Sequence, residues 1–490
     1  MRRLPALFPV LVVGSLALAV RVIYNLTVAA AYVPLFDARS YEQIALHLLQ
    51  EHCFCEHPLV PTVYRAPLWP ALIACIYALF GQHNLLVRFF LSLVGTGTCL
   101  LLFFFVRDLY GKRLGMLAGL FAAVYPELYI YDGWLYSESI TIFLLLALCY
   151  ILYRMTTRET TLFSWCLCAI VLALLVLARP NGLLACGIFL CWLFLALKQH
   201  WLSWWSRWQL VGRACLVGGL TLLMLTPWTL RNYRVSHSFL PVATGDGTVL
   251  LGAYNDLVLT TPGYIGSWIN PRLAAPALAA RYPAICSAPC ELKREEDFKR
   301  GAGLWMERHP GSLPFLLVMH LWNLWQPETV EGDLPTIRFP SAPGALEVVL
   351  MMRSFPLLVF ALALLGVGTI WGRWRLWLPV LLAVAFIIGQ SLIFYGSPRM
   401  RAPIEPLLIL LASAAIARWA ERWRRPQYRP GTDRKGTSAT SQARETAPQP
   451  GKRTRLKLWV GLVLPPVTAL KTYSSDDEKR RGLTRIALAS

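Results

Sequence analysis

Long apolar runs alternate with short polar connections along most of the chain. A helix needs about 20 apolar residues in succession to cross a bilayer, and we identify about ten such runs. The runs lie near residues 5–24, 85–106, 114–130, 139–153, 162–178, 182–197, 211–229, 346–370, 376–395 and 402–418. This pattern predicts an all-α polytopic membrane protein with about ten transmembrane helices.

Two apolar stretches, at 66–80 and 313–325, are shorter and have a proline close to their starts. They are typical of interfacial or re-entrant helices in outer loops. The first apolar run follows Arg2 and Arg3, so it resembles either a signal peptide or an uncleaved anchor. We favour the anchor, and either outcome leaves the sidedness of the later helices unchanged.

Composition narrows the class of protein. The 490 residues are 56% hydrophobic and 15% charged, whereas charge approaches a quarter of an ordinary soluble domain. The net charge of +20 is compatible with nucleic-acid binding, but repeated apolar runs of spanning length do not suit a basic groove. Positively charged cytoplasmic loops explain the charge better, so we expect no nucleic-acid partner.

Lys and Arg residues concentrate in alternate connections, which assigns these connections to the cytoplasm. They are Arg2, Arg3, Arg107, Lys112, Arg113, Arg154, Arg158, Lys198, Arg207, Arg213, Arg373, Arg375, Arg418, Arg422, Arg424 and Arg425. The pattern predicts a cell (inner) membrane protein with both termini cytoplasmic and outer loops at about 25–84 and 231–345. Residues 1–425 form the predicted transmembrane domain, and 426–490 a basic, disordered cytoplasmic tail.

The remaining ionisable residues collect on the outer side, at span ends or in outer loops. This set comprises Asp37, Arg39, Arg65, Arg88, Glu127, Asp132, Glu138, Arg179, Arg231, Arg399, Arg401 and Glu405. Ionisable groups at membrane depth are costly and therefore candidates for function, while snorkelling to the interface is the alternative explanation.

The first outer loop carries the clearest candidates. Residues 37–50 show apolar side chains at helical spacing, so they predict an interfacial amphipathic helix that Asp37 begins. Asp37 suits either an acid in catalysis or a helix N-cap. Arg65 precedes Pro67 at a second helix start, where a guanidinium and free amides favour a phosphate or, alternatively, a lipid headgroup.

Further outer residues complete a candidate site. Asp132 and Glu138 lie in one short loop, DGWLYSES, and paired carboxylates suit base-assisted displacement at a sugar carbon. Arg231, Arg399 and Arg401 add cations that suit a departing lipid-linked phosphate. We find no chemistry in the charged patch LKREEDFKR, which predicts a solvated helix.

Cysteines and histidines crowd into EHCFCEH, at His52, Cys53, Cys55 and His57. Their spacing is too tight for a standard structural zinc site. With Cys286 and Cys290 in the long outer loop, the four outer cysteines allow three disulfide pairings. We assign no metal ligand and no cofactor, and dependence on a divalent metal stays open.

The motifs DARSY, YRAPLWP, LYSES, ARPNG, PWTLRNY and GSPRMRAPIEP follow one another in this order. Together they resemble bacterial GT-C glycosyltransferases related to protein O-mannosyltransferases and the aminoarabinose transferase of lipid A, a glycosyltransferase family 39-like group. The resemblance covers about residues 1–425. It implies a GT-C-like fold and an outer-face active site that passes a sugar from a polyprenyl-phosphate donor to an acceptor with inversion.

The resemblance also implies roles for single residues. Asp37 matches the catalytic acid of the first loop, Tyr41 its helical neighbour and Glu138 the acid of the second loop. Arg65 matches the cation that meets the donor phosphate, and later motifs contain Arg231, Arg399 and Arg401. Ala38 stands where many relatives have a second acid, and Arg65 where they have Lys. Expected partners are this donor, membrane lipids and an acceptor that is a protein, a lipid or a glycan.

A transporter or flippase of a lipid-linked substrate is the alternative function. Transporters tend to contain inverted repeats and charges near the bilayer midplane, whereas the acids here lie at the outer boundary. A noncatalytic membrane scaffold is a third interpretation, which would require the outer acids to be dispensable. The sequence identifies neither the sugar nor the acceptor.

Overall fold

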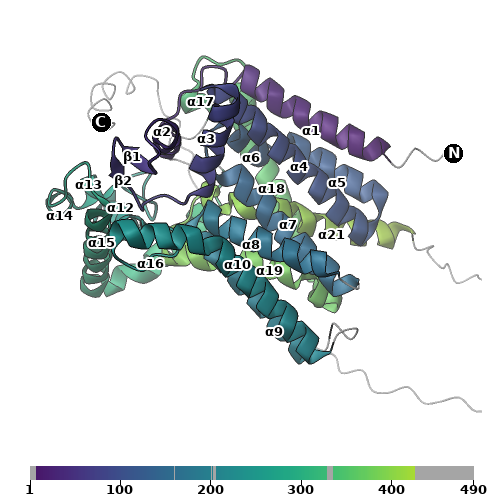
Figure 1. Ribbon diagram of the computed structural model, residues 1–490. Coiled ribbons are helices and arrows are strands. Elements are labelled where there is room, and N and C mark those ends of the chain that lie inside the picture. Colours follow the sequence, from purple (N-terminus) through teal and green to yellow (C-terminus); the bar gives the residue numbers. More distant parts are fainter. Residues whose placement is uncertain (1–6, 159–160, 200, 202–205, 328–334, 425–490) are drawn as a thin grey trace, which may run out of the picture. The chain divides into compact units, whose positions relative to one another are not determined.

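A computed structural model of the protein describes residues 7–158, 161–199, 201, 206–327 and 335–424 (Figure 1). The chain divides into two compact units, Met1–Pro426 and Gln427–Ser490. The first unit contains all the described residues. The predicted tail at 426–490 and the terminal cations Arg2, Arg3 and Arg425 lie outside them.

Each apolar run found in the sequence overlaps a long helix. The long helices are α1 (Phe8–Leu26), α4 (Asn84–Tyr110), α5 (Lys112–Val124), α7 (Glu138–Thr157), α8 (Leu162–Ala178), α9 (Leu183–Lys198), α10 (Arg207–Ser236), α18 (Ala345–Ile370), α19 (Trp374–Ile393) and α21 (Glu405–Arg424). They run side by side as a bundle in Figure 1. Helices satisfy their own backbone hydrogen bonds, which is what a hydrocarbon environment requires.

Short elements connect the long helices and gather largely at one end of the bundle (Figure 1). In the first loop they are α2 (Asp37–Gln50), the antiparallel pair β1 (Cys55–His57) and β2 (Val60–Pro61), and α3 (Leu68–Phe80). Next come α6 (Pro126–Tyr129), η1 (Ile130–Gly133) and η2 (Pro180–Gly182). The long loop holds α11 (Asp246–Ala253), α12 (Leu257–Thr260), α13 (Pro271–Ala274), α14 (Pro276–Ala279), α15 (Ala288–Arg308), η3 (Pro310–Ser312), α16 (Leu313–Leu324) and α17 (Pro335–Arg338). The others are η4 (Trp371–Arg373), α20 (Pro398–Arg401) and η5 (Ala402–Ile404).

The length and composition of the helices indicate a multi-pass membrane protein. Among the described residues, seven helical segments are long and apolar enough to cross a bilayer, and eight if a bent pair counts as one span. One of the seven, Ala345–Ile393, contains both α18 and α19. Helix α8 falls short of the spanning length, so the number ten stays a prediction.

The run at 114–130 is not the straight span that the sequence predicted. Helix α5 ends at Val124, and the following segment, Pro126–Gly133, is bent away from it by 68°. Pro126 explains the break, because proline has no amide hydrogen and disfavours helical backbone at the residue before it. The bend leaves α6 and η1 as short buried turns ahead of α7.

One hydrophobic core lies between the long helices, and a smaller one lies inside the long loop between α10 and α18. The larger core includes Trp69, Trp165 and Trp377. Helices α18 and α21 approach so closely that a Cβ on Gly366 would lie 2.0 Å from the carbonyl oxygen of Leu411. Small residues allow such approaches between membrane helices. The smaller core is formed by α11, α15 and α16, which gives the loop a folded interior of its own.

Candidate active site

Asp37 is the first residue of α2, and its carboxylate bonds two arginines instead of capping the helix. Asp37 Oδ1 accepts a hydrogen bond from Arg65 Nη2 at 2.8 Å, and Asp37 Oδ2 accepts one from Arg399 Nη2 at 2.8 Å. The N-cap position belongs to Phe36, whose φ of 50° is unusual for a residue with a Cβ. The N-cap interpretation of Asp37 is therefore wrong, and the carboxylate keeps 30% exposure.

Arg399 joins the two predicted catalytic acids. It belongs to α20, and its Nε donates to Glu138 Oε1 while its Nη2 reaches Asp37. The guanidinium also stacks on the ring of Tyr136, with 4.2 Å between its Cζ and the ring centroid. Because one planar fork contacts carboxylates from α2 and α7, the two acids share a single site.

Glu138 begins α7 and is completely buried. Arg179, which directly follows α8, donates to Glu138 Oε1 at 2.9 Å. The second oxygen, Glu138 Oε2, is also buried and has no hydrogen-bond partner among the described residues. A buried carboxylate oxygen without a donor retains its capacity to accept a hydrogen bond from a substrate hydroxyl.

Arg65 lies in the loop that precedes α3, which starts at Leu68. Its Nε donates to Ser40 Oγ at 3.1 Å, and its guanidinium faces the rings of Tyr41 and Tyr64 at 5.2 and 5.0 Å. Tyr41 is thus beside Arg65, in the cluster where the sequence expected it. Aromatic faces stabilise a cation without neutralising it.

The charges in this cluster favour an anion. The guanidinium groups of Arg65, Arg179 and Arg399 meet only two carboxylates. These carboxylates belong to Asp37 and Glu138, so the cluster has one positive charge in excess. Burial alone would raise the pKa of Asp37, but Arg65 and Arg399 hold this pKa well below its ordinary value. Asp37 is therefore ionised and, while both arginines bind it, a weak base.

Three residues that the sequence proposed for substrate binding make their contacts elsewhere. Asp132 is buried and pairs with Arg21 of α1 at 2.6 Å. Arg231 of α10 donates to the carbonyl oxygens of Thr62 and Phe54 at 2.6 and 3.0 Å. Asp132 and Arg231 therefore bind structural partners and do not join the cluster around Asp37.

Arg401 is the third of these residues, although it lies only two positions after Arg399. Its Nε pairs with Glu405 Oε1 at 2.5 Å, and its Nη1 donates to the carbonyl oxygens of Leu324 and Gln326. The side chain is fully buried. On the short helix α20 the two arginines point to different partners, which the sequence GSPRMRAPIEP does not reveal.

Sequence reasoning did not assign Arg179, Ser40 and Tyr136 to the site. Arg179 had a usable signal, because it was one of the outer ionisable residues and lies in the motif ARPNG. Ser40 and Tyr136 had none, since a hydroxyl and a ring become informative only when a guanidinium lies against them. All three contact Arg65, Glu138 or Arg399.

The four loop cysteines pair locally, as Cys53–Cys55 and Cys286–Cys290. Within the described part of the chain, no group of three or more His, Cys, Asp or Glu side chains is placed to hold a metal ion. In this cluster the guanidinium groups can attract an anion, and the carboxylates can take part in acid–base chemistry.

Residues 59–229 match the family model of dolichyl-phosphate-mannose-protein mannosyltransferases. The structure is similar to the oligosaccharyltransferase of Archaeoglobus fulgidus in complex with Zn and sulfate, with a TM-score of 0.50 and 12% identity over 85% of this chain. The fold and the family model agree. The chain has the fold of this membrane glycosyltransferase.

Two further GT-C structures are similar to the chain. AglB from Archaeoglobus fulgidus, in complex with an inhibitory peptide and a dolichol-phosphate, gives a TM-score of 0.50 at 14% identity over 85% of this chain and 50% of that one. ArnT from Cupriavidus metallidurans, bound to undecaprenyl phosphate, gives 0.39 at 14% identity over 85% and 79%. The chain spans about half the length of the oligosaccharyltransferases, 49% in the Zn and sulfate complex. No curated protein matches the sequence.

Proposed function

We propose that the protein is a membrane glycosyltransferase that moves a sugar from a polyprenyl-phosphate donor to an acceptor at the outer face of the cell membrane, with inversion. The observation that carries the proposal is the bridge that Arg399 makes between Asp37 and Glu138. Two acids for acceptor chemistry and a surplus of guanidinium for a phosphate meet there, and this combination suits transfer from a phosphate-linked sugar.

The donor phosphate binds between Arg65 and Arg399 in this proposal. Both guanidinium groups have exposed surface, with side-chain exposures of 18% and 14%. Their planar forks can bind phosphate oxygens as they now bind Asp37. AglB, which shares the fold, was solved with a dolichol-phosphate, and this agrees with a lipid phosphate as the ligand.

Donor binding also prepares Asp37 for its role as a base. The phosphate competes with Asp37 for Arg65 and Arg399, so the carboxylate loses part of the pairing that lowers its pKa. A freed carboxylate is a stronger base and can accept the proton of an acceptor hydroxyl. Glu138 stays paired with Arg179 through Oε1, and its second oxygen orients the acceptor or donor. Attack opposite the departing phosphate inverts the sugar carbon.

The lipid chain of the donor has a suitable place beside the site. A pocket between α7, α9 and α19 is lined mainly by apolar side chains, among them Leu145, Ile188 and Phe386. Its polar edge is the amide pair of Asn181 and Gln390, which are joined by a 3.1 Å hydrogen bond. Asn181 is two residues from Arg179, which belongs to the charged cluster. We propose that the part of the lipid chain next to the phosphate lies along this pocket.

The experiment that tests the function compares glycans on lipids and surface proteins, by mass spectrometry, between wild-type and deletion strains. We expect one glycan species to disappear on deletion, to return with the wild-type gene and to stay absent with the Asp37→Asn variant. Purified protein supplied with the corresponding polyprenyl-phosphate sugar and the acceptor that carries this glycan should then release polyprenyl phosphate and form the glycosylated acceptor. An unchanged glycan profile would favour the transporter.

A further inference from the structure

The segment that leads to Arg65 is held by the long outer loop. We propose that Glu291 of α15, together with Arg231, is a positioning residue that sets the place of Arg65 by fixing Thr62 and Val63. The inference rests on the proposed function, because it concerns the cation that receives the donor phosphate. It gives a role to a helix and a disulfide that the sequence analysis left without one.

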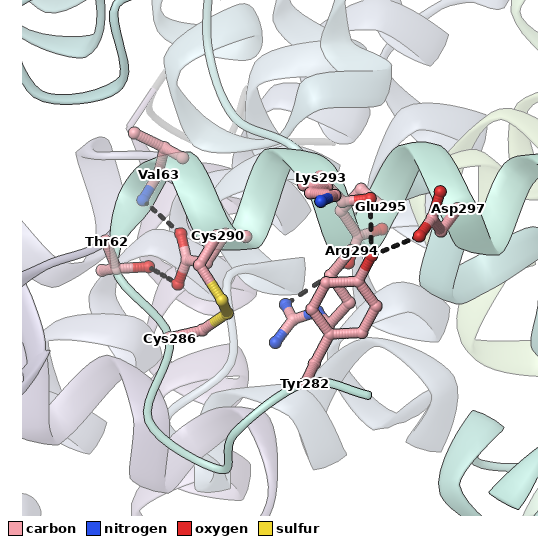
Figure 2. The surroundings of a disulfide bond; sticks show 10 residues. Thr62, Val63, Tyr282, Cys286, Cys290, Lys293, Arg294, Glu295 and Asp297 are labelled. Carbon is pink, nitrogen blue, oxygen red and sulfur yellow. Dashed lines mark hydrogen bonds and ion pairs between the residues drawn. A yellow bond between two sulfur atoms is a disulfide. The ribbon is translucent and has the colours of Figure 1, made fainter. Parts of the chain in front are cut away.

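Glu291 uses both of its oxygens on this segment. Thr62 Oγ1 donates to Glu291 Oε1 at 2.7 Å, and the Val63 amide donates to Glu291 Oε2 at 2.8 Å. Figure 2 shows the Thr62 hydroxyl and the Val63 amide directed at α15, beside the Cys286–Cys290 disulfide. Glu291, Thr62 and Val63 are all buried, with exposures of 6%, 2% and 0%. Buried bonds to a carboxylate fix a segment more firmly than exposed ones.

The other polar groups of the segment are bonded as well. Arg231 Nη1 donates to the Thr62 carbonyl at 2.6 Å, and the Thr244 amide donates to the Val63 carbonyl at 3.0 Å. The Thr62 amide reaches the Phe54 carbonyl at 3.1 Å. The backbone N–H and C=O groups of Thr62 and Val63 are therefore all hydrogen-bonded, three and two residues before Arg65. A chain held in this way leaves its next residues little freedom, which is the condition for a precise phosphate ligand.

Helix α15 is held in place by contacts of its own, so it can position the segment that leads to Arg65. Glu295, one turn after Glu291, is buried and accepts bonds from the amide and hydroxyl of Thr248 at 2.7 and 2.5 Å. The solvated interpretation of LKREEDFKR is thus wrong for this face of the helix. The Cys286–Cys290 disulfide ties the first turn of α15, directly before Glu291, to the preceding loop. Among the neighbouring acids, Glu296 is exposed.

The test measures the affinity of detergent-solubilised protein for a long-chain polyprenyl monophosphate, with no turnover required. Glu291→Ala should weaken binding about 10-fold, as expected when a charge-assisted hydrogen bond is lost. Glu291→Gln should restore binding, because its amide oxygen can accept from Val63 while its amide nitrogen donates to the Thr62 hydroxyl. Glu296→Ala is the matched control and should bind like the wild type. Thermal unfolding of each variant reports whether it is folded.

A double-mutant cycle with Arg65→Ala separates positioning from general damage. If Glu291 acts through Arg65, then Glu291→Ala should weaken binding no further once Arg65 is removed. Thr62→Val, a change of similar shape, should weaken binding less than Glu291→Ala and serves if that variant does not fold. Replacement of Cys286 and Cys290 by Ala should weaken binding in the same direction, and unchanged binding would remove the disulfide from the inference.

The outcomes distinguish this inference from the function on which it rests. Wild-type protein that binds no polyprenyl monophosphate would overturn the proposed function, and the inference with it. Wild-type protein that binds, with Glu291→Ala equal to it, would overturn the inference alone. Equal effects of Glu291→Ala with and without Arg65 would also overturn it, because Glu291 would then act by another route.

Discussion

Two ion networks of the molecule use the same residue types, but solvent and ligands can reach only one of them. The cluster of Asp37, Arg399 and Glu138 lies where loops meet the helix bundle, and its Asp37 keeps 30% exposure. Arg21 and Asp132 form a pair inside the bundle with side-chain exposures of 0% and 1%. One network can exchange a protein partner for a ligand, and the other cannot.

Packing around Arg21 explains why that pair is closed. A Cβ added at Gly95 would lie 2.0 Å from Asp132 Oδ2 and 2.4 Å from Arg21 Nε. A neighbouring helix therefore covers the pair with bare backbone and leaves no room for a ligand. In the sequence, both networks consist of acids and arginines near the ends of apolar runs, so the pattern does not distinguish them. Access, not charge, separates a candidate active site from a structural ion pair.

The largest expected effect comes from Asp37→Asn. This variant keeps the shape of the side chain but removes the base, whose contribution is about 100-fold to 10,000-fold in rate. Transfer, measured as release of polyprenyl phosphate, should fall by about this factor while thermal unfolding changes little. Asp246→Asn is the matched control, since Asp246 is an exposed acid that pairs with Lys299. Full turnover by Asp37→Asn with a verified donor would refute the assignment.

The closed network predicts the opposite pattern for Arg21→Leu. Removing one partner leaves Asp132 buried and unpaired, which should cost about 3–5 kcal/mol of folding stability. The double variant Arg21→Leu with Asp132→Leu should recover most of this loss, because both charges are then gone. The KM for the donor should stay unchanged in whatever protein folds. Thermal unfolding and donor titration check both points, and a raised KM with normal stability would show that Asp132 serves the substrate after all.

The apolar pattern was sufficient to predict the helices, because spanning length and hydrophobicity are local properties of the sequence. The sequence also assigned an early acid, Asp37, and an early cation, Arg65, to one loop, but it did not predict the ion pair between them. The bend at Pro126 was missed because one break did not interrupt the apolar run from 114 to 130. Pattern alone cannot tell a straight span from a bent one.

The site was only partly predictable for a different reason. Arg399 and Arg401 lie two residues apart, yet one bridges Asp37 and Glu138 while the other enters the core beside Glu405. Their directions depend on α20 and on the helices around it, which are distant in sequence. Glu291 was missed in the same way, since its partners Thr62 and Val63 lie more than 200 residues earlier, with separations of 229 and 228.

Arg399→Lys tests the exposed network, and its expected effect on donor affinity is smaller than the effects above. Lysine keeps the charge, but a single ammonium group cannot reach Asp37 and Glu138 with the geometry of a planar fork. We expect donor affinity to fall about 10-fold, the effect of one lost charge-assisted hydrogen bond. Arg375→Lys is a suitable control, because Arg375 lies at the start of α19 and stacks on Trp201. Donor titration that gives equal affinities for Arg399→Lys and wild type would exclude Arg399 as a bidentate ligand.

The smallest expected effect is a shift between two pH profiles. Arg65 and Arg399 lower the pKa of Asp37. The ion pairs of Asp37 are therefore complete at any pH above the ordinary aspartate pKa, and they are lost only as the pH falls through the lowered pKa. The profile of kcat/KM for the donor reports the free enzyme, so it should stay flat down to about pH 5 on account of Asp37. The profile of kcat reports the donor complex, where the phosphate has taken the arginines and the pKa of Asp37 has risen. Its acid limb should therefore lie at higher pH, whereas coincident limbs would mean that the donor leaves the Asp37 pairs intact.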